Sequence, residues 1–261
     1  MKAILAAAFL VFLCVAPAGC FKPKPPERAG VDSPGYRATR EKARKFNELM
    51  NTGFNCLELC KDIEVKKTLL IQHSAYDSPE MQDLVDKQMK LLQQADGNFR
   101  EALRMDQSSM AAHQALCQVL IRLGGYDEAI EHGLAVLKSA PARMTVYRDV
   151  AVAYERKGYN SQGAESIKDY EEAVRIITEY YPKDTDEISQ AQMVAYLGEI
   201  CYERLAALMT GPDKVKQYER IIDVLGNYLK DHPDNPFADG MKSRVDAARE
   251  GKADFESGYG E

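Results

Sequence analysis

The chain has 261 residues, of which 45% are hydrophobic and 28% are charged, and its formal net charge at pH 7 is −6. This balance is that of a globular protein with enough apolar residues for a sizeable core. A net negative charge disfavours binding along the phosphate backbone of a nucleic acid, so we expect no nucleic-acid partner.

The first residues have the organisation of a secretory signal peptide. Lys2 is followed by an apolar run over residues 3–15, which is shorter than the roughly 20 residues that usually cross a bilayer. An alanine and a glycine then precede Cys20, and this order resembles the bacterial lipobox, in which cleavage exposes a cysteine that becomes lipidated. The resemblance implies a signal peptide over residues 1–19 and lipid attachment at Cys20. Ordinary secretory cleavage after Ala18 and an uncleaved anchor are the alternatives.

Residues 20–36 contain several prolines and few residues that could form a core, so we expect an extended tether. A tether directly after the proposed lipid site suits a protein that is held at a membrane surface. Basic residues open the helical region that follows, and they could either attract anionic lipid headgroups or form a solvated helix face. They are Arg37, Arg40, Lys42, Arg44 and Lys45.

Two long helices are predicted next. Apolar residues recur at three- and four-residue spacing over residues 36–71, and again over residues 78–105. Ser78 is a favourable N-cap, and Pro79 and Glu80 suit the first helical turn. The sequence therefore predicts a long helical hairpin.

Residues 110–143 contain two shorter amphipathic helices joined by a tight turn. The apolar pattern is interrupted at Gly124 and Gly125 and resumes until Pro141. A glycine suits the left-handed position after a helix, and a proline ends the second helix because it lacks an N–H. The order of a small residue, Gly, an aromatic residue, Ala and Pro resembles the tetratricopeptide repeat. The residues that carry the resemblance are Cys117, Gly124, Tyr126, Ala129 and Pro141.

The resemblance implies an all-α fold, an α-solenoid of stacked helix–turn–helix repeats over residues 37–250. Its atypical parts are the long N-terminal hairpin and a last helix, residues 237–249, whose polar face with Lys242, Arg244 and Asp246 suits an end cap. The glycine-rich residues 251–261 lack an apolar stripe, so we expect a disordered tail there.

Two further repeats are predicted between these ends. Gly158 is expected to end the first helix of one repeat, and the extra residues 159–168 to form either a loop or a longer helix. The other repeat is expected to begin at a capping box of Asp184 and Glu187 and to turn at Gly211.

The sequence offers little support for catalysis or metal binding. Its four histidines are scattered, and none stands in a motif with a nucleophile and an acid, so we expect no enzyme activity, no cofactor and no metal site. Cys56 and Cys60 lie four residues apart on a predicted helix, where they form either a disulfide or two thiols. Cys117 and Cys201 occupy small core positions and are expected to be buried free thiols.

Polar residues on the first helices of tetratricopeptide repeats line a concave groove that receives a partner segment. Carried over to this chain, the resemblance implies a set of groove positions, each of which could also be merely solvated. They are Gln114, Gln118, Arg122, Arg148, Val152, Glu155, Gln192, Glu199 and Glu203. Chaperone-binding members hold a terminal carboxylate with lysine and asparagine, but glutamines stand at the first pair here, so that ligand is not implied.

We expect a non-catalytic scaffold or assembly factor of the bacterial cell envelope, because the closest general resemblance is to envelope lipoproteins with these repeats. The expected partners are an envelope protein bound in the groove, and the membrane itself through a lipid on Cys20. The periplasmic face of the outer membrane is the favoured location. The alternative is a secreted or periplasmic solenoid that binds a small ligand or a cell-wall component.

Overall fold

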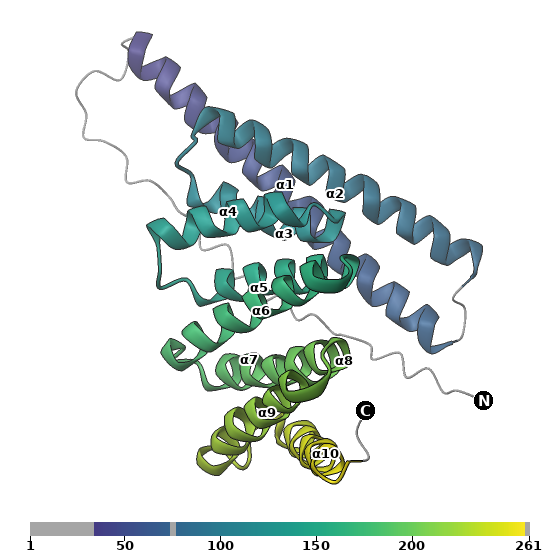
Figure 1. Cartoon of the computed structure of the whole chain (residues 1–261). Coiled ribbons are helices and arrows are strands. Elements are labelled where there is room, and N and C mark those ends of the chain that lie inside the picture. Colours follow the sequence, from purple (N-terminus) through teal and green to yellow (C-terminus); the bar gives the residue numbers. More distant parts are fainter. Residues whose placement is uncertain (1–33, 74–76, 259–261) are drawn as a thin grey trace. The chain divides into compact units, whose positions relative to one another are not determined.

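The computed structural model describes residues 34–73 and 77–258, and every element within these ranges is helical (Figure 1). For these ranges the expected all-α fold is confirmed. The predicted signal peptide, the lipid-attachment site at Cys20 and residues 20–33 of the tether lie outside the described residues. Among the residues that are described, no helix is both long enough and apolar enough to cross a membrane.

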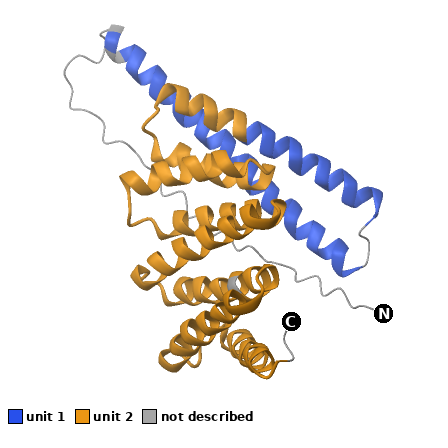
Figure 2. Cartoon of the chain, in the orientation of Figure 1, with its two compact units in different colours: residues 1–95 blue, residues 96–261 orange. Residues whose placement is uncertain are grey.

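Two compact units divide the chain, residues 1–95 and residues 96–261 (Figure 2). The first unit contains α1 (Pro34–Gln72) and most of α2 (Pro79–Met105), whose last turns belong to the second unit. Helix α1 begins before residue 36, where the predicted tether was to end. Its first residue is a proline, which suits this position because the first N–H groups of a helix have no partner within the helix.

Helices α1 and α2 are the two long helices that the sequence predicts. Ser78 caps α2, because its hydroxyl oxygen accepts a hydrogen bond of 3.1 Å from the Met81 N–H. Between the helices, the Gln88 side chain accepts a hydrogen bond from Lys67 Nζ and donates one to Glu64, each 3.1 Å long. This polar link helps to fix the register of the two helices, since a shifted pairing would separate the three side chains.

Cys56 and Cys60 are buried thiols, so the disulfide that their spacing allowed is not formed. Helix α1 continues without interruption through both residues, and a bridge would distort it to bring the two sulfur atoms together. The Cys60 thiol points instead to the carbonyl oxygen of Gln88, with 3.9 Å between sulfur and oxygen. Cys117 is a buried free thiol, as expected.

Helices α3 (Met110–Leu123) and α4 (Tyr126–Ser139) form the short hairpin that the sequence predicts. Gly124 has a φ of 84°, the left-handed conformation expected of a glycine that ends a helix. Ser109 caps α3 by accepting a hydrogen bond of 3.3 Å from the Ala112 N–H. The turn and the two helices therefore lie where the glycine and proline signals place them.

Helices α5 (Met144–Asn160) and α6 (Gly163–Tyr180) pack against each other. The sequence predicts a helix end at Gly158, which is wrong, because α5 continues beyond it. Gly158 is buried, and a Cβ there would lie 3.1 Å from the Ser166 carbonyl oxygen, so the glycine allows the two helices to approach. The extra residues 159–168 lengthen the helices instead of forming a loop.

The remaining elements continue the helical array. They are η1 (Tyr181–Lys183), α7 (Glu187–Glu199), the π-helix η2 (Ile200–Leu205), α8 (Ala206–Leu208), α9 (Gly211–Asp231) and α10 (Ala238–Glu256). The predicted capping box of Asp184 and Glu187 is wrong. Asp186 caps α7 by accepting a hydrogen bond of 2.7 Å from the Ser189 N–H, and Asp184 accepts one of 3.0 Å from the Asp186 N–H.

Helix α10 extends past residue 251, where the sequence predicts a disordered tail. Gly251 lies against Tyr218 of α9, and a Cβ there would lie 2.7 Å from the Cζ atom of the ring. In the sequence this glycine contributes to the prediction of a disordered tail, but in the structure it allows two helices to pack closely. The described part of the expected tail is helical through Glu256.

The helices of the second unit form a stack of hairpins. Helix α4 packs on α3 and α5, α5 packs on α6, and α9 packs on α10, so each helix contacts mainly its neighbours in sequence. Helix α3 also contacts α5, which places the first helices of two consecutive hairpins side by side (Figure 1). One cluster of buried apolar side chains extends from α4 to α10. This arrangement is the α-solenoid that the sequence predicts.

Candidate functional site

Side chains of α3, α5, α7, η2 and α10, all of them polar except Val152, form a row that contains most of the predicted groove positions. We call this row the polar strip, and all of it lies in the second unit. Its members are Gln114, Gln118 and Arg122 of α3; Arg148, Asp149, Val152, Glu155 and Arg156 of α5; Tyr196, Glu199, Glu203 and Arg204 of α7 and η2; and Arg244 of α10.

Asp149 is the centre of the part of the strip between α3 and α5. Its carboxylate is buried and accepts a hydrogen bond of 2.9 Å from the Gln118 amide. Burial raises the pKa of Asp149 to about 6, while this hydrogen bond and the charges of Arg148 and Arg122 oppose the shift. One turn earlier on α3, Gln114 accepts a hydrogen bond of 2.7 Å from an arginine that precedes α5.

Glu155 joins α5 to η2. Its side chain is buried, with the Nε atom of Arg156 at 3.4 Å and that of Arg204 at 3.9 Å from its carboxylate oxygens. Burial raises the pKa of Glu155, and the two arginines oppose the shift. The hydroxyl of Tyr196 is buried nearby, and burial together with the charges of Glu155 and Glu199 raises the pKa of this tyrosine.

Glu199, the last residue of α7, joins α7 to α10. Arg244 of α10 lies 4.0 Å from the Glu199 carboxylate and 3.2 Å from that of Glu203. Burial, followed by the charge of Glu203, raises the pKa of Glu199 to about 7, although Arg244 and Arg204 favour the ionised form. Part of the Glu199 population is therefore protonated at neutral pH.

The π-helical turn η2 arranges this end of the strip. In a π-helix the backbone hydrogen bonds join residues five apart, so residues at that spacing lie above one another. Glu199 and Arg204 have this spacing, and their charges interact. Short π-helical segments within longer helices occur frequently at functional sites, which draws attention to this end of the strip.

The structure brings together most of the predicted groove residues, and it adds others that the sequence analysis missed. Val152 is half-buried between Asp149 and Glu155 on α5, and Gln192 lies one turn before the strip on α7. The strip also needs Asp149, Tyr196 and Arg204, which were not among the predicted positions. Arg244 was predicted on an outward face of the last helix, but it contacts two glutamates of the strip. These positions depend on how the helices cross.

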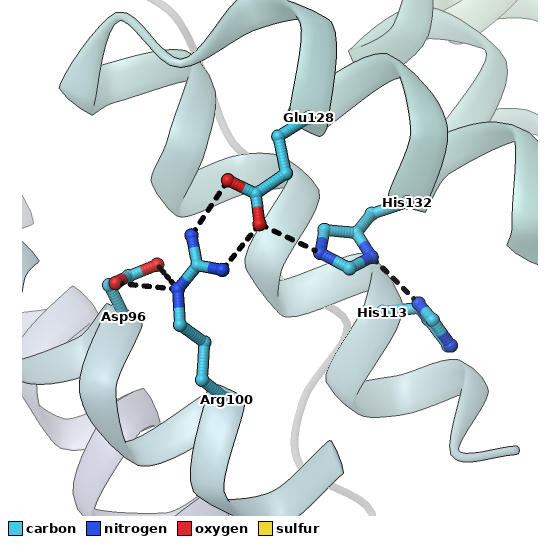
Figure 3. A network of polar contacts seen from close by, with 5 residues as sticks. All are labelled: Asp96, Arg100, His113, Glu128 and His132. Atoms are coloured by element: carbon cyan, nitrogen blue, oxygen red, sulfur yellow. Dashed lines mark hydrogen bonds and ion pairs between the residues drawn. The ribbon is translucent and has the colours of Figure 1, made fainter. Parts of the chain in front are cut away.

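A second cluster of polar contacts joins α2, α3 and α4 (Figure 3). Arg100 of α2 pairs with Asp96 of the preceding turn and binds both carboxylate oxygens of Glu128 in α4. His132 lies one turn further along α4, with its Nε2 atom 3.7 Å from Glu128. Its Nδ1 atom lies 2.9 Å from the Nδ1 atom of His113 in α3. The cluster therefore connects three helices.

This cluster is best explained as a structural link. Two of the four histidines, which the sequence analysis treated as scattered, face each other at a hydrogen-bonding distance of 2.9 Å. Two nitrogens bound to one tetrahedral zinc ion, each at about 2.0–2.1 Å, would lie further apart than this. Within the described residues, no group of three or more His, Cys, Asp or Glu side chains could hold a metal ion.

Comparisons with known proteins found a matching family and a similar solved structure. The family described as "Bacterial transcriptional activator domain" matches residues 75–180. This match covers less than half of the chain. The crystal structure of a thermophilic TPR protein of Thermus thermophilus is 16% identical, with a TM-score of 0.37, covering 61% of this chain and 91% of that chain. No curated protein matches the chain. The helical-repeat architecture therefore rests on the packing described above.

Proposed function

We propose that the chain is a non-catalytic scaffold that holds a segment of a partner protein along the polar strip. The observation that carries the proposal is the alignment of polar side chains from successive helices, since α3 contacts α5 and both η2 and α10 add to the same row. A site for nucleophilic catalysis would place a nucleophile beside a base. The four carboxylates of the strip instead face arginines or an amide, an arrangement suited to recognition.

The alternative, binding of a small ligand, has less support in this unit. A cavity beside Gly198 is lined mainly by apolar side chains of α7 and α9 and has a volume of about 50 Å³. Pockets for drug-sized ligands are usually larger than about 300 Å³. The cavity therefore has room for only a few water molecules.

Site-specific photo-crosslinking in cells that express the full chain tests the proposal. A photo-reactive amino acid at Gln118 or Glu203 should form adducts with a protein partner. The same amino acid at Glu131 of α4 or Glu171 of α6, which are exposed and lie outside the strip, should form none. Equal labelling from all four positions, or no adducts from the strip, would contradict the proposal.

The identity of the crosslinked protein decides between two cellular settings. The N-terminal sequence with Cys20 favours a protein of the cell envelope, the location we propose. The name of the matched family points to transcription, although the net charge of −6 disfavours direct binding to DNA. Recovery of a transcription protein would exclude the envelope setting and leave the scaffold role intact.

We also propose that a lipid on Cys20 anchors the chain to a membrane. The support is the apolar run that ends in a small-residue pair before this cysteine, followed by a proline-rich segment. Cells grown with radioactive palmitate should label the full chain, and Cys20→Ala should abolish the label. A chain without label, or label that remains in the variant, would contradict lipid attachment at this residue.

A further inference from the structure

At the end of the polar strip formed by α5, α7, η2 and α10, two of the three acidic side chains are less exposed than the arginines. The side chains of Glu155 and Glu199 are 7% and 13% exposed. The side chains of Arg156 and Arg204 are 45% and 33% exposed, and that of Arg244 is 25% exposed. Most of the charge that a partner could reach at this end is therefore positive.

The arginines contact the buried glutamates through ion pairs, and Arg244 also donates a hydrogen bond of 3.2 Å to Glu203. Arg204 reaches Glu155 only at 3.9 Å and Arg244 reaches Glu199 only at 4.0 Å, which are ion-pair distances and too long for hydrogen bonds. Within the described part of the chain, the Nε–H groups of Arg204 and Arg244 are buried without an acceptor, so a partner would have to pair with the outer ends of these guanidinium groups. A guanidinium has five N–H donors, and a carboxylate can accept two of them in parallel.

We propose that the partner segment held by the polar strip is acidic and carries carboxylates that pair with Arg156, Arg204 and Arg244. This inference rests on the proposed function and names the chemistry of its partner. Charge complementarity is its basis, because the three arginines are more exposed than the two buried glutamates that they pair with. The arginines thus form a positive patch on a chain whose overall charge is negative.

Glu203 is the one exposed acid of this end of the strip, with a side chain 45% exposed and 3.2 Å from Arg244. The Glu203 carboxylate binds the Arg244 guanidinium, which an incoming carboxylate would also bind, so Glu203 competes with the partner. Removing its charge should strengthen binding of an acidic segment. A surface that served only the internal stability of the fold would not show this gain.

The buried carboxylates add a dependence on pH that agrees with the proposal. Glu199 faces Glu203, Arg244, Arg204 and Glu155, and its pKa of about 7 means that it gains a proton as the pH falls below neutral. The pKa of Glu155, which faces Arg156, Arg204 and Tyr196, is also raised. Protonation of Glu199 makes this end of the strip more positive, so an acidic segment should bind more tightly at pH 6 than at pH 8.

Fluorescence anisotropy with the full chain and three labelled peptides tests the inference. The peptides share one Gly/Ser framework and carry glutamate, glutamine or lysine at the same positions. The glutamate peptide should bind most tightly, and Arg204→Gln or Arg244→Gln should weaken its binding by about three- to tenfold. Glu203→Gln should strengthen it, while Glu179→Gln should leave it unchanged, since Glu179 is an exposed acid paired with Arg175 on α6, outside the strip.

Thermal unfolding of each variant tests whether a loss of binding reflects a loss of folding. The tighter binding expected of Glu203→Gln needs no such control, because a misfolded variant would not bind more tightly. Equal binding of the three peptides, tighter binding of the lysine peptide, or weaker binding by Glu203→Gln would overturn the inference. A different result would contradict the proposed function, namely the absence of photo-crosslinks from the strip positions. Crosslinking to a neutral or basic segment would keep the scaffold role and reject the acidic partner.

Discussion

At the scale of single residues, Glu199 is the side chain of the polar strip whose charge is most sensitive to its surroundings. Its pKa of about 7 lies above the ordinary value of 4.5, so the folded chain binds a proton that the unfolded chain has released. Stability should therefore fall as the pH rises from about 4.5 to 7. One pKa unit corresponds to about 1.4 kcal/mol, and we expect Glu199→Gln to be more stable than the parent chain by on the order of 2 kcal/mol at pH 8.

Urea unfolding followed by circular dichroism at several pH values measures this difference. The advantage of the variant should shrink toward zero below about pH 4, where Glu199 is mostly protonated in both states. A difference that stays constant with pH would mean that the substitution acts through packing and not through the carboxylate.

Gly133 is the clearest steric constraint in the array. A Cβ at this position would lie 2.3 Å from a methyl carbon of Val150 and 3.3 Å from the sulfur of Cys117. We expect Gly133→Ala to destabilise the chain by about 1–3 kcal/mol through overpacking. Gly226 of α9 has no atom within 4 Å of its Cβ position, so Gly226→Ala should stabilise by about 0.4–1 kcal/mol. Equal effects in thermal unfolding would contradict the packing of α4 on α5.

Several functional residues could be predicted from the sequence, and others could not. Gln118, Glu155 and Glu199 were among the groove positions that the resemblance to tetratricopeptide repeats implies on the first helix of each hairpin. Asp149 was not predicted because it lies among apolar neighbours on α5, and its burial follows only from the packing of α3 against α5. Arg244 contacts residues more than forty positions earlier in the chain, a contact that no local pattern encodes.

At the scale of elements, the histidine cluster links α3 and α4 and should respond to pH (Figure 3). Burial and the charge of His113 lower the pKa of His132, while Glu128 opposes the shift. The unfolded chain therefore binds a proton more readily, and stability is lost as the pH falls below the ordinary histidine value of about 6.5.

His132→Asn should remove this loss, so the stability of the variant relative to the parent should increase between pH 7 and pH 5. Thermal unfolding at the two pH values provides the measurement, and the Glu199→Gln background removes the opposing contribution of that carboxylate. A relative stability that does not change with pH would show that His132 titrates alike in the folded and unfolded chains.

The lengths and ends of the elements were predicted unevenly. Gly124 ends α3 in a left-handed backbone conformation. This conformation depends on the local sequence alone, so the end of α3 could be predicted. Gly158 and Gly251 are also glycines, but they lie within helices, where the missing side chain allows another helix to pack closely. The π-helical turn η2 leaves no periodic signal of its own, and it places Arg204 in the strip.

At the scale of the whole molecule, the order in which the helices pack predicts how a local defect spreads. The fold class was predictable because apolar spacing and turn residues mark each hairpin, and the stack follows from hairpins that must cover one another. Each helix of the second unit contacts mainly its sequence neighbours. Stability should therefore be a sum of nearest-neighbour contributions, and a defect at one end should remain there.

Gly251→Ala tests this expectation, because its added methyl group would collide with Tyr218 and separate α10 from α9. Hydrogen exchange followed by mass spectrometry should show faster exchange in these two helices and unchanged exchange in α3 to α5. Gly133→Ala serves as the matched comparison, and it should instead accelerate exchange in α3, α4 and α5. Faster exchange across residues 96–258 with either variant would mean that the array unfolds as one cooperative unit, and that its helices are coupled beyond their neighbours.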